Sequence, residues 1–456
     1  MRRGLDLERC KTHEMVGWGR LPRAECHEYR PESRAGVREL LLGKAQPSMI
    51  PRGLGRSYGD AALNPNGGVL TLSRLDRLIA FDAESGLLEC EGGVSLGTLL
   101  EVFVPRGWFP PVTPGTRHVT VGGAIANDVH GKNHHCDGSF GAHVRSFMLL
   151  TPDGTERRCS REENAELFAA TLGGIGLTGI VLSARIKMMP ITTARVLRHR
   201  VRTASLDETL EEVTRAERRH QYAVAWLDCL TRGAGTGRGV VIKGDHAIPG
   251  DLPKGIDEPL AWRPRAEKPV PLDMPGGLLN RWSVAAFNEA YYRAHPSQSD
   301  AVVPLENFFY PLDGVANWNR LYGRRGFAQY QATIPLEEAD GLRALIEHLT
   351  SAKRASFLAV LKTFGAAGDG MLSYPSPGFT LALDLPNAAG LTDFLHGLDR
   401  IVLEHGGRLY LAKDSCMEVE TFRASYPRWE EFREVKERVD PHNRLQSAMS
   451  RRLGLT

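Results

Sequence analysis

The chain has 456 residues, 42% of them hydrophobic, and its 57 basic and 54 acidic residues give a formal charge of +3. This composition predicts two or three globular domains, and the nearly balanced charge argues against a nucleic-acid partner. The 7 cysteines lie far apart without a CxxC pair, which argues against a zinc site and a disulfide framework and fits a reducing compartment.

The sequence predicts neither a secretory signal peptide nor a membrane-spanning helix. Residues 1–15, MRRGLDLERCKTHEM, carry positive charge but no apolar core follows them, so we expect no secretory signal peptide. The most apolar run, 171–186, is glycine-rich and shorter than the roughly 20 residues of a membrane-spanning helix. We therefore expect a cytoplasmic protein with peripheral contact at the inner membrane, and the sequence leaves a periplasmic location open.

From residue 43 to 190, short β-rich runs alternate with glycine turns. The runs at 69–72, 87–90, 147–150 and 180–188 predict strands. Ser95 is the expected N-cap of a short helix that ends before Pro105. Few other helices are expected here, so residues 1–192 are predicted to form a sheet-rich α+β domain.

A second domain is expected at residues 193–412. A capping box at Ser205 and Glu208 predicts a helix to about His220, and strands are expected at 222–227 and 239–243. Residues 245–280 combine clustered prolines and charges with little periodicity, which predicts a long mobile loop or lid.

The rest of this domain alternates regularly. Strands are predicted at 328–334, 356–362, 379–385 and 408–412, with helices after the first and third of them, the latter at 391–404. The order β-α-β-β-α-β is typical of a split βαβ layer whose sheet leaves one face open, and such a face can roof a site. Residues 427–453 are expected to be helical on either side of Asp440 and Pro441, and the sequence shows no internal repeat.

Three glycine-rich segments, at 51–60, 114–146 and 171–180, indicate a ligand site. Glycines let a backbone approach a ligand closely, and successive N–H groups can bind an anion. The spacing of Gly53, Gly55 and Gly59, with turn and strand after them, does not match the Rossmann fingerprint. Three converging loops suit an extended dinucleotide, with Ile125 and Ile180 packing its rings.

Five histidines in the segment 114–146 raise the alternative of a metal site. His130 and His134 are four residues apart, as metal ligands on a helix would be. Gly131 and Asn133 make a helix poor there, and no glutamate base accompanies them. We therefore expect no metal.

Several strings resemble the vanillyl-alcohol-oxidase-type FAD flavoproteins. They are GLGRSYGD at 53–60, PGTR, VTVGGAIA and HGKNHH within 114–135, GSFG and HVRS within 138–146, GLTGI at 176–180, FAQYQ at 327–331, GGRLYLAKDS at 406–415 and VDP at 439–441. The resemblance implies a two-domain α+β fold of the PCMH type. FAD would lie between the first domain, completed by the returning segment 413–456, and an antiparallel-sheet cap domain.

Within this family, the strings are most similar to oxidases of a lipid-phosphate-linked ribose. The similarity implies oxidation of the 2'-hydroxyl of a polyprenylphosphoryl-β-D-ribose to a keto intermediate, the first half of epimerisation to an arabinose donor for cell-envelope polysaccharide. A separate NAD(P)H-dependent short-chain reductase would complete it, and either quinone or oxygen would accept the electrons. An aldonolactone or alditol oxidase and a non-catalytic flavin-binding protein are the alternatives.

The resemblance also implies roles for individual residues. Lys413, His130 and Tyr58 are expected at the reacting centre. Those expected around the substrate are Lys132, Gln329, Gln331, Lys362 and Trp226, although a core position for Trp226 is an equal alternative. Lys413 acts either as a base, if burial or Lys362 lowers its pKa, or as a charged group that holds the substrate. The residues expected to bind the cofactor are Gly53, Gly55, Arg56, Ser57, Tyr58, Gly59, Pro114, Gly115, Thr116, Gly122, Gly123, Ala124, Ile125, Asn127, His130, Asn133, Gly138, Gly141, Gly176, Gly179, Ile180 and Tyr410.

Four positions depart from what the resemblance would lead us to expect. Arg56 stands where many members of the family carry the histidine that bonds FAD covalently, so noncovalent FAD is expected. Ala382 stands where similar oxidases carry a cysteine, and the aromatic pair Phe309 and Tyr310 also differs. These departures bear on the lipid and sugar specificity.

Overall fold

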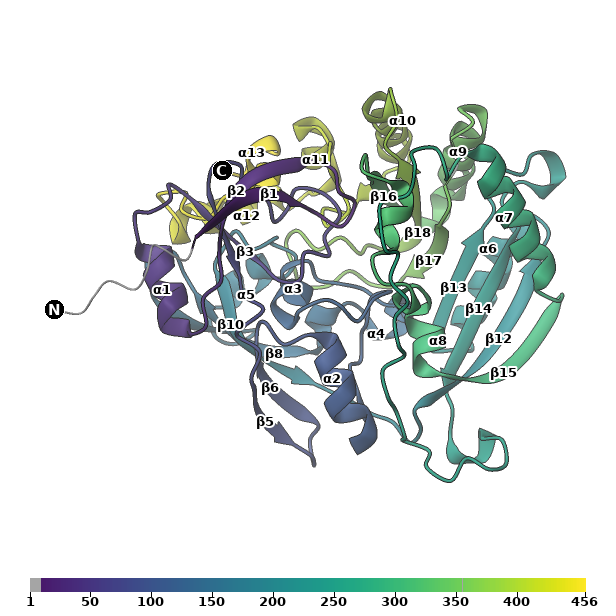
Figure 1. Ribbon diagram of the computed structural model, residues 1–456, viewed down its shortest axis with the longest axis horizontal. Coiled ribbons are helices and arrows are strands. Elements are labelled where there is room, and N and C mark those ends of the chain that lie inside the picture. The colour runs from purple at the N-terminus through teal and green to yellow at the C-terminus, as the bar shows by residue number, and fades with distance from the viewer. Residues whose placement is uncertain (1–9, 355) are drawn as a thin grey trace.

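The computed structural model describes residues 10–354 and 356–456, so part of the N-terminal segment on which the signal-peptide expectation rests lies outside the described residues. The fold is α+β, as predicted, with a sheet-rich N-terminal region beside a large antiparallel sheet (Figure 1). Within the described ranges, no helix combines the length and the apolar character needed to cross a membrane.

The N-terminal region contains two main sheets. The first has the order β1 (Lys11–Val16), β2 (Arg23–Tyr29), β4 (Gly68–Thr71), β3 (Met49–Arg52), and α1 (Arg34–Leu42) connects β2 to β3. The second has the order β5 (Leu78–Asp82), β6 (Leu87–Glu91), β10 (Ile180–Lys187), β8 (Val144–Leu150), β9 (Glu156–Ser160) and is antiparallel. All four strands predicted for this region are confirmed.

Short helices connect these strands. They are α2 (Leu96–Phe103), α3 (Val121–Ala126), α4 (His134–Asp137) and α5 (Ala165–Thr171). Ser95 caps α2 as predicted, because its hydroxyl accepts the Thr98 N–H at 2.9 Å, and α2 ends where a 3-10 turn containing Pro105 begins. A short ribbon of β7 (Trp108–Phe109) and β11 (Met189–Pro190) leads out of the region.

The second region is built on one eight-stranded antiparallel sheet. Its order is β15 (Gln298–Pro304), β12 (Arg195–Thr203), β14 (Gly239–His246), β13 (Tyr222–Leu227), β17 (Ala359–Phe364), β18 (Gly378–Pro386), β16 (Phe327–Ile334), β19 (Arg408–Leu409). Strands β12 to β15 and strands β16 to β19 each take the order fourth, first, third, second, and the two halves meet where β13 pairs with β17. The topology therefore repeats although the sequence does not.

Three helices cover one face of this sheet: α6 (Leu206–Glu217), α9 (Ala339–Ser351) and α10 (Leu391–Glu404). Strand alternation divides β16 accordingly, because Ala328, Tyr330 and Ala332 join the core under these helices while Gln329 and Gln331 face the other way. The predicted β-α-β-β-α-β order and its open face are confirmed.

The segment between β14 and β16 contains α7 (Arg281–Ala294) and α8 (Leu305–Phe309), which the sequence pattern did not predict. Before α7, residues 252–280 contain neither helix nor strand. Ion pairs connect this segment to the N-terminal region, Arg20 to Asp273 at 2.6 Å and Arg117 to Glu267 at 2.8 Å. Its mobility stays a prediction.

The C-terminal segment contains α11 (Val419–Ser425), α12 (Trp429–Val439) and α13 (Ala448–Arg452). It packs beside β1 and β2, as the yellow and purple ribbons of Figure 1 show. Leu445 bridges to Met49, and the Ala448 N–H donates to the Leu63 carbonyl at 2.8 Å. The domain boundaries at 192 and 412 stay predictions.

Candidate functional site

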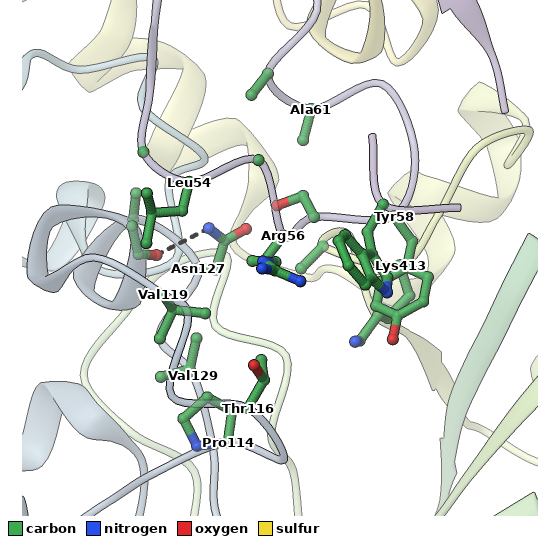
Figure 2. A pocket seen from close by; sticks show the side chains of 18 of the residues that line it. Leu54, Arg56, Tyr58, Ala61, Pro114, Thr116, Val119, Asn127, Val129 and Lys413 are labelled. Atoms are coloured by element: carbon green, nitrogen blue, oxygen red, sulfur yellow. Dashed lines mark hydrogen bonds between the residues drawn. The ribbon is translucent and has the colours of Figure 1, made fainter. Parts of the chain in front are cut away.

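A cavity of about 290 Å³ lies between the glycine-rich loops of the N-terminal region and the open face of the eight-stranded sheet. Its walls come from segments 51–62, 114–130 and 171–181, from β16, β17 and β18, and from residues 410–413. Side chains from several of these segments point into it (Figure 2). The three glycine-rich segments, more than 100 residues apart at their extremes, therefore meet around one space.

Most of the predicted site residues line this cavity. They are Gly53, Gly55, Arg56, Ser57, Tyr58, Gly59, Pro114, Gly115, Thr116, Gly122, Gly123, Asn127, His130, Gly176, Gly179, Gln329, Gln331, Lys362, Tyr410 and Lys413. Others lie behind its wall. Ala124, Ile125 and Ile180 are fully buried in hydrophobic cores, and Gly141 donates its N–H to Asp128 at 2.8 Å. Asn133 donates to the Pro111 carbonyl at 2.8 Å, and Gly138 ends α4.

Close backbone approaches fix the loop 53–60 on both sides. A Cβ at Gly53 would lie 2.3 Å from the Thr120 hydroxyl, which caps α3 by accepting the Gly123 N–H at 3.1 Å. A Cβ at Gly59 would lie 1.8 Å from the Asp414 carbonyl oxygen, and the neighbouring Tyr58 N–H donates to the Ala412 carbonyl at 2.9 Å. The loop thus fits only with glycine at these positions.

Three residues that line the cavity have buried polar atoms without a hydrogen-bond partner in the described part of the chain. Arg56 Nε, Asn127 Oδ1 and His130 Nδ1 find no hydrogen-bond partner among residues 10–354 and 356–456. The other end of the Asn127 amide donates to the Gly123 carbonyl at 2.9 Å, and the Arg56 guanidinium lies 3.9 Å from the centre of the Trp18 ring. Because buried polar groups are normally paired, these atoms fit a ligand rich in polar groups, such as FAD.

Lys413 lies at the end of the cavity next to the sheet. Its ammonium nitrogen is 3.9 Å from the centre of the Tyr58 ring, and Figure 2 shows the two side chains together. The pKa of Lys413 is lowered to about 7, chiefly by burial; the negative charge of Asp384 acts against this shift, and the positive charge of Lys362 adds to it. Burial also lowers the pKa of Lys362, to about 8. A sizeable fraction of Lys413 is therefore neutral near pH 7.

His130 is held neutral beside these lysines. Burial lowers its pKa well below the usual range, with Lys362 contributing next. The Gln331 side-chain nitrogen lies 3.1 Å from His130 Nε2 and 3.1 Å from the Thr380 hydroxyl. Because an amide nitrogen only donates, His130 Nε2 accepts and Nδ1 carries the proton. His130 thus offers a free N–H donor.

Asp384, which lies behind the cavity wall and acts on Gln329 and Lys413, is a residue that the sequence reasoning missed. It lies on β18 directly across from Gln329, is fully buried, and accepts the Gln329 side-chain N–H at 2.5 Å. Burial raises its pKa to about 7. The available signal was an acid in the otherwise apolar strand FTLALDLP.

Two residues predicted around the substrate lie outside the cavity lining. Lys132 donates to the carbonyls of Phe308 at 2.9 Å and Phe309 at 3.0 Å, and so connects the loop after α3 to α8. Trp226 is 6% exposed and packs against Tyr291 of α7, with ring centres 4.7 Å apart. The roles of all these residues stay predictions.

The remaining histidines do not point toward a common centre. His134 accepts the Gly365 N–H at 3.2 Å, and His135 and His143 bond to the carbonyls of His220 at 3.0 Å and Asp137 at 2.8 Å. In the part of the chain that the structure describes, no three His, Cys, Asp or Glu residues gather as metal ligands would.

Comparison with known families agrees with this site. The family model described as FAD binding domain matches residues 29–160, and the model of D-arabinono-1,4-lactone oxidase matches residues 384–453. The chain belongs to the FAD-binding oxidoreductases of the vanillyl-alcohol-oxidase type. It is 40% identical to decaprenylphosphoryl-β-D-ribose oxidase of Mycolicibacterium smegmatis over 450 residues, 97% of this chain and 98% of that protein.

More distant relatives share about a third of the chain. Cytokinin dehydrogenase 7 of Oryza sativa is 30% identical over 37% of this chain and 33% of its own length. L-gulonolactone oxidase of Mus musculus is 29% identical over 36% of this chain and 37% of its own length.

Proposed function

We propose that the chain uses FAD to oxidise the 2'-hydroxyl of a polyprenylphosphoryl-β-D-ribose to the 2'-keto sugar. The observation that carries this proposal is the group Lys413, Lys362 and His130 at one end of the cavity, on a scaffold 40% identical to decaprenylphosphoryl-β-D-ribose oxidase over 97% of the chain. This group combines a neutral base, a positive charge for a phosphate and a hydrogen-bond donor for a sugar oxygen.

The loops 53–60 and 114–127 would hold the cofactor. Asn127 and Arg56 would pair with its polar groups, and Arg56, which cannot form the histidyl bond, favours noncovalent FAD. When bound, FAD accepts the hydride that leaves the carbinol carbon.

The residues beside the sheet would handle the hydroxyl proton. Neutral Lys413 takes this proton as the C–H bond breaks, because its pKa of about 7 suits a base at neutral pH. His130 donates through Nδ1 to a sugar oxygen, and Lys362, with its higher pKa of about 8, stays more fully charged for the phosphate. The Gln329 and Gln331 amides orient the ribose from the sheet.

The oxidation to the keto sugar would be the first half of an epimerisation. A separate NAD(P)H-dependent short-chain reductase would reduce it to the arabinose epimer for cell-envelope polysaccharide, while quinone or oxygen reoxidises the flavin. A polyprenyl substrate implies peripheral contact with a membrane, for which we propose the cytoplasmic side.

A soluble lactone or sugar oxidase is the second candidate. The match of residues 384–453 to the D-arabinono-1,4-lactone oxidase model favours it, because this range includes Lys413. The two candidates differ in the substrate that reduces the enzyme.

An anaerobic half-reaction tests the proposal. The purified holoenzyme is mixed with geranylphosphoryl-β-D-ribose or with D-arabinono-1,4-lactone, and the visible flavin absorbance is followed. The proposal expects bleaching by the lipid-linked ribose and a product that has lost two hydrogens. Bleaching by the lactone alone would establish the second candidate, and protein purified without flavin would refute both.

A further inference from the structure

Helix α7 leaves an apolar stripe exposed. The side chains on this stripe are Trp282, which is 71% exposed, Ala286, Phe287, which is 39% exposed, and Ala290. Trp282, Ala286 and Ala290 follow one another at spacings of four residues, and Phe287 is three residues before Ala290, so the four side chains lie within about 140° on one side of the helix. Large exposed aromatic side chains on one helix face indicate a partner surface.

The opposite side of α7 is fixed to the sheet. Val284 is 1% exposed, and the buried Asn288 side chain donates to Asp228 at 2.8 Å. Glu289 pairs with Arg238 at 2.6 Å. These contacts hold the helix in one orientation, so the stripe is a rigid surface feature.

Aromatic contacts connect the stripe to the cavity. The Phe287 ring lies 5.8 Å from Tyr291 and 4.8 Å from Phe357, and Tyr291 lies 4.7 Å from Trp226. Trp226 pairs directly across from Val360 of β17, which lines the cavity. Phe357 precedes Leu358, which also lines the cavity. A path of contacting aromatic rings thus runs from Trp226, beside the cavity wall, to Phe287, and the exposed Trp282 lies further toward the N-terminus of the helix; we name this path together with Trp282 the α7 track.

The α7 track has the length of a short isoprenoid. From Tyr291 to Trp282 the helix axis runs about 14 Å, the length of about three isoprene units. Upstream of the helix, Leu278 and Leu272 add exposed apolar surface, at 46% and 62% exposure. By contrast, the charged groups Lys413 and Lys362 lie inside the cavity.

We infer that the α7 track seats the isoprenoid chain of a lipid-linked sugar while the phosphoribose end occupies the cavity. This inference rests on the proposed function and extends that proposal to the isoprenoid part of the substrate. The phosphate is joined to the ribose carbon next to the oxidised one. The isoprenoid chain, which is attached to this phosphate, must therefore leave the cavity close to the reacting centre. The lining residues Leu358 and Val360 form an apolar part of the cavity wall next to Phe357 and Trp226, where the α7 track begins.

Chain-length kinetics test this inference on the holoenzyme. The kcat/KM for geranylphosphoryl-β-D-ribose is compared with that for the geranylgeranyl homologue in wild type and in the double variant Trp282→Ser/Phe287→Ser. Leu42→Ser, an equally drastic change at a 52% exposed leucine of α1, is the matched control. We expect wild type and control to prefer the longer chain by about tenfold, the double variant to lose most of this preference, and geranyl turnover to stay unchanged.

Calorimetric binding of geranylgeranyl phosphate, which lacks the sugar, separates this inference from the proposed function. If neither of the two lipid-linked riboses is oxidised but the double variant binds geranylgeranyl phosphate more weakly than the control does, the isoprenoid site on the α7 track is supported and the proposed reaction is refuted. If both riboses are oxidised with an unchanged preference in the double variant, the α7 track is refuted and the reaction stands. Loss of binding to anionic vesicles with an unchanged preference also overturns the inference, because the stripe would then contact the membrane itself.

Discussion

Replacement of Lys413 by methionine tests whether this residue is a base. A lysine with its ordinary pKa of 10.5 would be neutral in about one molecule in three thousand at pH 7, whereas a pKa of about 7 makes half of the molecules neutral. Burial thus raises the concentration of the base by about a thousandfold. We expect Lys413→Met to slow flavin reduction by about 10²–10⁴-fold, the usual contribution of a general base.

The pH dependence of flavin reduction shows whether the neutral or the charged form of Lys413 is the reactive one. Because the neutral amine is the reactive form, the wild-type rate constant for flavin reduction should rise about tenfold per pH unit below pH 7 and level off above it. Anaerobic stopped-flow absorbance at saturating substrate measures this profile, with Lys44→Met at an exposed lysine as control. A wild-type profile that is flat across this range, together with a variant that changes only KM, would show that Lys413 binds substrate and would refute the base.

Three further predictions concern the same site and its support. Asp384→Asn removes a carboxyl group whose negative charge, present above its pKa of about 7, raises the pKa of Lys413, so the rate profile should shift to lower pH; a shift to higher pH would contradict this. Gly53→Val should lower the flavin-to-protein absorbance ratio because its Cβ would meet Thr120, whereas Gly250→Val, in open space, should not. Lys436→Met leaves the buried Asp440 carboxylate without its ammonium and should lower the free energy of unfolding by about 3–5 kcal/mol in urea; an unchanged midpoint would contradict this.

Local signals predicted many elements of this fold. Ser95 and Ser205 accept the expected N–H groups at the start of α2 and α6, at 2.9 Å and 3.3 Å, and α10 spans the predicted 391–404. Such patterns are set by capping and by periodic burial, which act within a few residues. Helix α7 was missed because its outward face is apolar, which removes the amphipathic contrast.

Long-range contacts explain what the sequence could not provide. The sequence predicted that the glycine segments converge, but not the contact in which the Ala412 carbonyl accepts the Tyr58 N–H and joins the loop 53–60 to the C-terminal return. Lys132 lies in a matching motif, yet its ammonium bonds to backbone carbonyls 176 and 177 residues away. Asp384 gains its significance only from the neighbouring strand that carries Gln329.

Isotopic labelling of the substrate tests the central claim most directly. Polyprenylphosphoryl-β-D-ribose carrying deuterium at the 2' carbon is mixed anaerobically with the holoenzyme, and flavin bleaching and the mass of the product are measured. The account predicts slower bleaching than with the unlabelled substrate and a keto product that has lost the label. Bleaching at an unchanged rate with the label retained, or no bleaching at all, would contradict oxidation at this carbon.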